Sequence, residues 1–477
     1  MDDLMFGELA GNGSSFGGAS TVKELQDLAK ALEVGYAMGT TDQTGFGATR
    51  LESLAPVVKW LTLNESSPAF FRAIRKGKAS STVEEFVTMN EVGDANFYSE
   101  GGLPDEYDED IRREFEQVKY IGTVGKVPLQ ALMVKSNTNN EALVTRAKAL
   151  AIMKTADSKL IYGDAARNPY EWNGYYKQFK TKAKSVTQNT IDLRGKRVRP
   201  ETLNESVQII ADNWGNPNNV KCWMSAKDFQ YYTDELLAGR RFVVGSSEAR
   251  DLIASAKRFE LGNGKGNIET DILLKYKGQN YIGAEYPKTN STMTVFAATN
   301  SKAPATLNSS TATISVDSDS ATLLDAATYD YAFVPVNRYG SGAAFEVKTN
   351  VVAASKRCTF TLTDNGSPSG QEATSFDIYR KLSSATAITS YRYLTSFTAA
   401  EAKIDNGEWI PGATNIFLWD WDFEQVLDFR QLLPMTKMEL ARIDDSKRWM
   451  QKLWAVPILA APNKMVMIKN AGSTAWS

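Results

Sequence analysis

The chain has 477 residues, of which 43% are hydrophobic and 23% are charged. This composition predicts a folded protein of roughly two to four domains and excludes disorder along the whole chain. The formal net charge of −2 gives no global attraction for nucleic acid or for an anionic membrane.

Two features of the composition argue against an enzyme. The sequence contains no histidine, which removes Ser-His-Asp and Cys-His catalysis and histidine-ligated zinc. Its two cysteines, Cys222 and Cys358, are too few for a disulfide framework and too far apart in sequence for a Cys-x-x-Cys site. We therefore expect no catalytic residues, no metal and no cofactor. A protein that works by assembly has no particular need of these residue types.

Residues 1–80 are predicted to form an N-terminal arm and the start of the main body. Gly11–Gly18 cannot hold a regular element, and one short amphipathic helix is expected over 22–32. The arm would pack on another surface, although a floppy terminus is the alternative. The acidic start Met1-Asp2-Asp3 predicts no signal peptide, and no apolar run reaches the ~18 residues that span a bilayer.

Residues 81–134 predict a long β-hairpin with one limb over 82–89 and a return limb over 115–134. Ten carboxylates and no lysine or arginine lie from Glu84 to Asp110. A tip of this length without its own core usually docks on a partner, although a solvated acidic loop is the alternative. The candidate contact residues at the tip are Asp105, Glu106, Asp108, Glu109 and Asp110.

Two basic clusters are candidates to receive this acidic tip from a neighbouring copy, or to meet DNA without sequence specificity. A solvated surface is the alternative for both. The clusters are Arg72, Arg75 and Lys76, and Arg194, Arg197 and Arg199.

Residues 135–300 predict an α+β body. A long helix is expected over 140–164, capped by Asn139 or Asn140 and ended by Gly163, the residue that commonly ends helices. A second helix should open at Arg199-Pro200.

The rest of this body mixes short elements. A buried strand is predicted over 221–224, a helix near 226–237, and two strands over 271–276 and 281–284. Gly262–Gly266 lacks the spacing of a phosphate-binding loop and is expected to be a flexible loop.

Residues 301–418 predict an inserted all-β, sandwich-like domain. Strict alternation over 328–336 is followed by a turn, and further strands are expected at 358–362 and 376–380. From 419 to 477 the chain is predicted to return to the main body.

Asp420, Asp422 and Glu424 alternate, so a strand would place three carboxylates on one face. The pattern resembles the Asp-x-Asp-x-Glu strand of chitinase-type glycosidases, which often carry fibronectin-like modules. No repeating strand and helix pattern of a barrel surrounds it, which argues against this alternative.

The order of parts is more informative than any single motif. A glycine-rich arm, an acidic hairpin, a long helix ending Ile161-Tyr162-Gly163-Asp164 and an α+β body follow one another. This order resembles the Hong Kong 97-type major capsid proteins of tailed phages, over about residues 20–295 and 420–470. The resemblance implies an N-arm, an E-loop hairpin, a P-domain with a long spine helix, and an A-domain. Residues 301–418 resemble an immunoglobulin-like or fibronectin-like insertion with a permuted strand order.

The resemblance implies a structural protein that self-assembles into hexamers and pentamers, forming an icosahedral head shell around double-stranded DNA. It would be made in the host cytoplasm and reside in the virion. Implied partners are further copies of itself, a separate scaffolding protein, a portal and cement proteins, with no membrane. The cross-linked members carry a lysine in the E-loop, and none lies between Glu84 and Asp110, so no covalent cross-link is expected. An encapsulin-like compartment and an adhesin or tail decoration protein are the remaining alternatives.

Overall fold

The computed structural model describes residues 68–91, 95–103, 106–108, 110–133, 139–183, 186–238, 258–261, 264–271, 301–384, 391–423, 425–442 and 444–472. The arm predicted before residue 68, with its helix over 22–32, lies outside these residues. So do the strand predicted over 281–284 and most of the strand predicted over 271–276.

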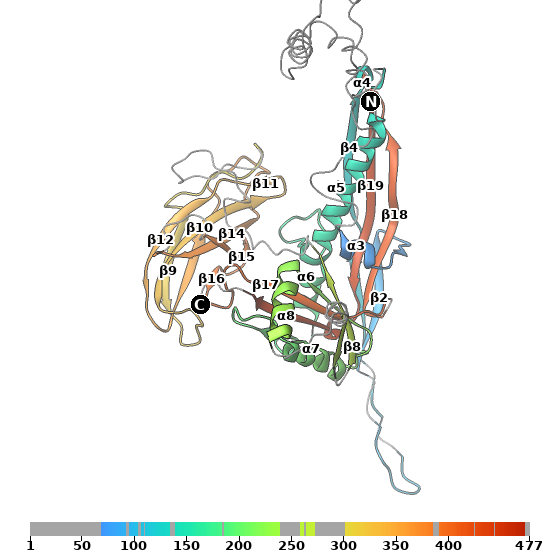
Figure 1. Ribbon diagram of the computed structural model, residues 1–477, viewed down its shortest axis with the longest axis vertical. Coiled ribbons are helices and arrows are strands. Elements are labelled where there is room, and N and C mark those ends of the chain that lie inside the picture. Colours follow the sequence, from blue (N-terminus) through green and yellow to red (C-terminus); the bar gives the residue numbers. More distant parts are fainter. Residues whose placement is uncertain are drawn as a thin grey trace, which may run out of the picture. The chain divides into compact units, whose positions relative to one another are not determined.

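A six-stranded mixed sheet forms the centre of the body (Figure 1). Its order is β5 (Thr190–Asp192), β20 (Met465–Ala471), β17 (Thr414–Asp420), β6 (Val220–Met224), β8 (Gly264–Thr270) and β7 (Arg258–Leu261). Every residue of β17 is buried, as expected for a strand that is covered on both faces.

Alternate side chains of β17 enter two different cores. Phe417 and Trp419 pack with α5 (Asn140–Tyr162) and α6 (Tyr175–Lys182). Ile416 and Leu418 pack with α7 (Pro200–Asp212) and α8 (Ala226–Ala238). The sheet therefore separates two helical layers, and the helices predicted at 200 and near 226 are confirmed.

A four-stranded sheet carries the long helix α5 (Figure 1). Its order is β1 (Gly77–Lys78), β18 (Leu427–Glu439), β19 (Ser446–Leu459) and β4 (Lys119–Pro128). The Gln451 side chain of β19 donates to the Thr145 carbonyl of α5 at 3.1 Å, which fixes the helix to one face of this sheet. The predicted helix is confirmed, and it ends at Tyr162.

Gly163 follows the last residue of α5, as predicted, but the reason for a glycine there is not the usual left-handed helix end. Gly163 does not adopt a left-handed conformation. A Cβ atom there would lie 2.5 Å from the Lys159 carbonyl and 2.6 Å from the Trp172 carbonyl. Glycine is required because the following loop returns against the helix end, where Gly174 donates to the Gly163 carbonyl at 2.9 Å. Because α5 begins at Asn140, Asn139 holds the N-cap position, and the Asn140 side chain donates to the Ala131 carbonyl of α4 (Leu129–Met133).

Replacing Gly174 with alanine should lower the free energy of unfolding by about 1–3 kcal/mol, as overpacking of a core usually does. The new Cβ atom would lie 2.5 Å from the Ile161 carbonyl, and backbone cannot move aside cheaply. Urea unfolding of the unassembled chain measures the change. Gly77→Ala is the matched control, since its Cβ would meet only ordinary contacts from 3.4 Å, and an equal loss in both variants would contradict the prediction.

The predicted return limb of the hairpin is wrong beyond Gln117. The first limb, β2 (Val83–Glu91), pairs antiparallel with β3 (Asp110–Gln117). Buried Val118 then donates its N–H to the Thr82 carbonyl, and β4 leaves the hairpin to pair with β19. Alternation shows that a strand has two faces, but it does not identify the strand's partner.

Residues 301–413 form two packed sheets without a helix among the described residues. One sheet has the order β11 (Gly340–Ser341), β10 (Ala327–Asn337), β14 (Ser375–Leu382) and β15 (Arg392–Thr398), with β12 (Phe345–Val352) also paired to β10. The other has β16 (Ile404–Asp405), β13 (Lys356–Leu362) and β9 (Ala312–Ser318). Tyr331 of β10 packs against Phe360 of β13 at 4.9 Å between ring centroids, which joins the two sheets.

Two other predictions are corrected by strand pairing. The all-β region gives way to the body earlier than residue 418, because β17 begins at Thr414 in the six-stranded sheet. Gly264, Lys265 and Gly266 are not a loop, since they lie in β8 between β6 and β7. Tertiary pairing overrides the low strand propensity of glycine here. The C-terminal part supplies β18 and β19 to the four-stranded sheet and β20 to the six-stranded sheet.

Candidate inter-subunit surface

The two-stranded ribbon β2–β3 exposes one mainly apolar face, on which Arg113 and Glu85 form an ion pair. Val83, Val87 and Met89 of β2 lie on the same face as their partners in β3, because side chains alternate along a strand. Val87 is 68% exposed, and its neighbours across the ribbon, Ile111 and Phe115, are 57% and 63% exposed. An isolated two-stranded ribbon is marginally stable in water, so this face is a candidate for contact with another surface.

The opposite face of the ribbon is fixed to the chain's own body. Lys182 of α6 lies 3.0 Å from Glu114 and 3.1 Å from Glu116 of β3. Its ammonium also lies 4.9 Å from the Phe86 ring centroid. The ribbon therefore has one covered face and one exposed face, and only the exposed face is available to a partner.

A buried carboxylate fixes the base of the ribbon. Glu84 accepts hydrogen bonds from the Ser80 and Ser81 N–H groups at 2.7 and 3.0 Å, and from Arg430 of β18 at 2.9 Å. Arg430 also contacts Asp428 at 2.6 Å. Burial opposes ionisation of Glu84, but Arg430 and the two N–H groups hold the pKa of this carboxyl below its usual range.

The predicted acidic tip is only partly described. Glu106 and Asp108 are exposed, whereas Asp105 and Glu109 lie outside the described residues. Asp110 is the first residue of β3 and pairs with Arg112 at 3.1 Å, so part of its charge is neutralised within the strand.

The first predicted basic cluster follows the short helix α3 (Ala69–Ala73). Arg72, Arg75 and Lys76 are exposed. The Lys76 ammonium donates to the Phe71 carbonyl at 2.9 Å and lies over the Phe71 ring at 4.7 Å. Although much of the Lys76 side chain is exposed, its ammonium is partly desolvated, and this, followed by the nearby charge of Arg72, lowers the pKa of Lys76. Lys76 therefore has a local role at the end of α3.

The second predicted cluster contacts two other parts of the chain. Arg194 donates to the Leu323 carbonyl at 3.1 Å. Arg197 and Arg199 lie 3.9 and 3.8 Å from Glu235 of α8. Such long, partly exposed ion pairs are worth only about 0–1 kcal/mol, so a neighbouring copy could displace them. Which cluster receives the acidic tip stays a prediction.

Sequence analysis missed a further apolar surface on the four-stranded sheet. Tyr120 and Val124 of β4 are 57% and 49% exposed, and Met438 of β18 is 46% exposed. The register places Tyr120 opposite Trp454, and Val124 opposite Met450, across β4 and β19. The alternation of apolar and polar residues over 119–128 indicates such a surface, but the sequence analysis places these residues in the hairpin.

Asp420 and Asp422 of the glycosidase-like pattern do not lie on one strand. β17 ends at Asp420, and the Asp422 carbonyl accepts the Val426 and Leu427 N–H groups of a turn. Asp420 is buried and accepts the Asn216 N–H at 2.8 Å. Glu424 lies outside the described residues. The strand expected for this alternative is therefore wrong, because the chain turns after Asp420.

Among the described residues, no group of three or more cysteine, aspartate or glutamate side chains is placed to hold a metal ion. None of the described helices combines the length and apolar character needed to cross a membrane.

Comparison with known proteins identifies relatives along almost the whole chain. No protein-family model matches. The chain is 22% identical over 468 residues to a protein named major capsid protein from Staphylococcus phage K, with 93% of this chain and 95% of the relative covered. The major capsid protein of Staphylococcus phage S25-3 has the same identity and coverage. The predicted function, a phage major capsid protein, is confirmed by these relatives.

Solved structures align over a similar extent but loosely. A capsid of a native GTA particle is 9% identical, with 91% of this chain and 100% of that chain covered and a TM-score of 0.42. An encapsulin complex from Synechococcus elongatus is 8% identical, with 90% and 95% covered and a TM-score of 0.42.

Proposed function

We propose that the chain builds the icosahedral head shell of a tailed phage, with the Hong Kong 97-type architecture, by forming hexamers and pentamers around double-stranded DNA. The exposed apolar face of the β2–β3 ribbon carries the proposal, since a ribbon with one uncovered face needs a surface to cover it. Similarity to major capsid proteins over 93% of the chain supports it. The chain would be made in the host cytoplasm and become part of the virion.

The ribbon takes the role of the E-loop in this proposal, and α5 takes the role of the spine helix. Around each ring the contacts are head-to-tail, so the surface that a subunit offers differs from the surface that it receives. Burial of Val87, Met89, Ile111 and Phe115 would supply most of the association energy, at about 25 cal/mol per Å² of apolar surface. The acidic tip would set register more than affinity.

The outer face of the four-stranded sheet is the receiving surface that we favour. Besides Tyr120 and Val124 it presents Lys452, whose ammonium lies 4.8 Å from the Trp454 ring centroid. An apolar strip with a cation at its centre complements an apolar ribbon with an acidic tip. The clusters around Arg72 and Arg194 remain candidates for the tip itself, and residues 301–413 would be an immunoglobulin-like insertion displayed on the shell.

Separate scaffolding, portal and cement proteins complete the proposed assembly. An encapsulin-like compartment is the second candidate, because the same shell geometry can enclose proteins instead of DNA. The contents of purified particles separate the two, since capsids from infected cells should contain DNA and an encapsulin should contain a cargo enzyme.

Expression of the chain, alone and with the phage's scaffolding protein, tests the proposal. Size-exclusion chromatography and negative-stain electron microscopy should show rings, tubes or closed shells. A monomer under both conditions and at all salt concentrations would contradict it.

Replacing Phe115 with aspartate should prevent assembly while leaving the unassembled chain folded. Phe115 is 63% exposed, so the subunit loses little on substitution, but a charge in a desolvated interface is costly. Particle yield and circular dichroism measure the two effects. Leu323→Asp, at a 48% exposed position of the all-β region, is the matched control, and an equal loss of particles in both variants would rule out a specific role for the ribbon face.

A further inference from the structure

Trp214 combines two features that are unusual together. Its side chain is 91% exposed, and its backbone has φ 61°, the left-handed region that costs an ordinary residue roughly 1–2 kcal/mol. An exposed side chain alone is common on protein surfaces. A tryptophan at such a position, with its indole exposed, gains no burial energy within the subunit that glycine would lack.

The strain comes from the way in which α7 ends. The Trp214 N–H donates to the Ala211 carbonyl at 3.0 Å, and the Gly215 N–H donates to the Ile210 carbonyl at 2.8 Å. These two bonds form a Schellman motif with Asn213 as the C-cap, in which the next residue is left-handed and is usually glycine. Here tryptophan occupies that position. The adjacent glycine is needed elsewhere, since a Cβ at Gly215 would lie 2.5 Å from the Ile210 side chain.

The loop that presents Trp214 is held rigidly by the body. The Asn216 N–H donates to buried Asp420 at 2.8 Å, and the Asn219 side chain donates to the Trp421 carbonyl at 2.9 Å. The Trp421 N–H returns a bond to the Asn219 carbonyl at 2.8 Å. Residues 213–219 contain no charged side chain. Tryptophan is enriched among the residues that dominate the binding energy of protein interfaces. An exposed tryptophan on a rigid, uncharged loop suits this role, because little conformational entropy is lost when it binds.

We propose that Trp214 is an anchor for a second copy of this chain, inserting its indole into the neighbouring subunit of a ring. This inference rests on the proposed shell function, which supplies identical copies at high local concentration. The strain at residue 214 then selects an outward-pointing indole before assembly, and Asp420 acts as the positioning residue for the loop.

Trp214→Gly provides the test, since it changes subunit stability and assembly in opposite directions. Glycine suits the left-handed position, so the thermal midpoint of the unassembled variant should stay unchanged or rise by about one to four degrees. The protein concentration at half-assembly should increase about tenfold or more. Trp214→Phe should restore part of the assembly.

Light scattering across a concentration series, with particle counts by electron microscopy, measures assembly. Leu323→Gly is the control, because it removes an exposed apolar side chain outside the loop. Assembly of Trp214→Gly at the wild-type concentration would overturn the inference and leave the shell function standing, as the wild type and control still form particles. A fall of the thermal midpoint by more than five degrees would also overturn it, by showing a structural role for the indole.

Discussion

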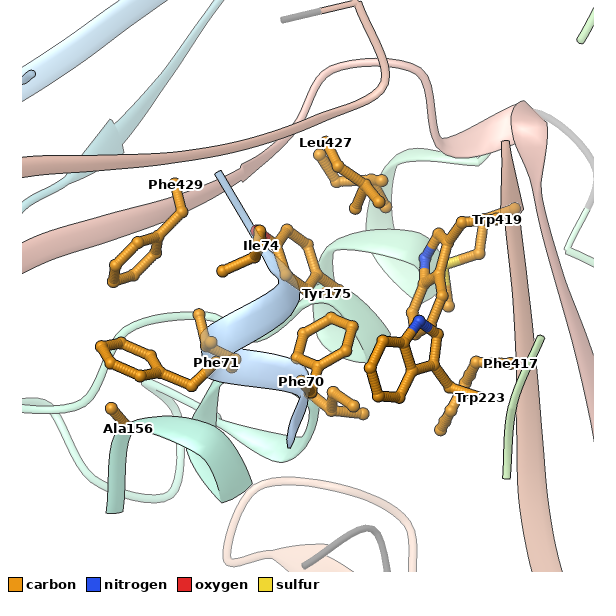
Figure 2. Close-up of a cluster of buried hydrophobic side chains, with 14 of the residues drawn as sticks. Phe70, Phe71, Ile74, Ala156, Tyr175, Trp223, Phe417, Trp419, Leu427 and Phe429 are labelled. Carbon is orange, nitrogen blue, oxygen red and sulfur yellow. The ribbon is translucent and has the colours of Figure 1, made fainter. Parts of the chain in front are cut away.

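Replacing Phe70 with alanine should lower the free energy of unfolding of the unassembled chain by about 3–5 kcal/mol, the usual cost of removing a fully buried phenylalanine. Phe70 lies at the centre of an aromatic cluster (Figure 2). Its ring centroid is 5.0 Å from that of Trp223 and 5.4 Å from that of Trp419. Removal leaves a cavity between α3 and both central strands, β6 and β17, which rigid rings cannot refill.

Guanidinium unfolding followed by tryptophan fluorescence measures this loss, since Trp223 and Trp419 report directly on the cluster. Phe97→Ala is the matched control, because Phe97 is fully exposed on the way to the hairpin tip. Phe70→Leu should cost less than Phe70→Ala, as it fills part of the space. Equal stability of Phe70→Ala and wild type would mean that α3 does not pack in the core.

Much of the body could be predicted because its elements carry their own signal. The helix over 140–162 shows apolar residues at helical spacing, and β6 is a short apolar run before a helix. The pairing of β4 with β19 could not be predicted, since both strands alternate and many partners fit equally well. For the same reason, residues 118–129 were predicted to pair within the hairpin.

The candidate contact surface was visible only in part. Composition alone predicts the acidic tip, because ten carboxylates without a lysine or arginine are unusual. The apolar residues Val87, Ile111 and Phe115 look like ordinary core positions in a sequence. Alternating apolar residues indicate a strand face that will be buried. They do not show whether the same chain or a second copy buries it. Trp214 carried no signal at all, since a left-handed tryptophan is identified only from the backbone.

Two buried carboxyl groups hold the segment that leads into α3. Asp157 of α5 accepts the Phe71 N–H at 2.6 Å, and Asp271 accepts the Phe70 N–H at 2.8 Å. Asp271 lies close enough to Asp157 to disfavour its ionisation. Burial, followed by the charge of Asp271, raises the pKa of Asp157 to about 8.

Asp157→Asn should make the chain more stable than wild type at pH 8, and the difference should grow as pH rises from 5 toward 8. The wild-type carboxyl keeps its proton in the folded state up to about pH 8, but loses it near pH 3.8 when unfolded. The unfolded state therefore binds fewer protons between these values, and wild-type stability falls by up to about 1.4 kcal/mol per pH unit. An asparagine retains the neutral geometry, with its oxygen accepting from Phe71 and its amide donating to Asp271.

Denaturant unfolding of both proteins from pH 5 to pH 8.5 measures the difference in slope. Asp234→Asn, at an exposed position of α8, controls for the loss of one negative charge. The Asp157→Asn advantage should level off above pH 8, because the wild-type carboxyl is then ionised in both states. A parallel pH dependence of wild type and Asp157→Asn would show that the pKa of Asp157 is not raised, and that α3 is held by an ionised carboxylate of Asp157 instead.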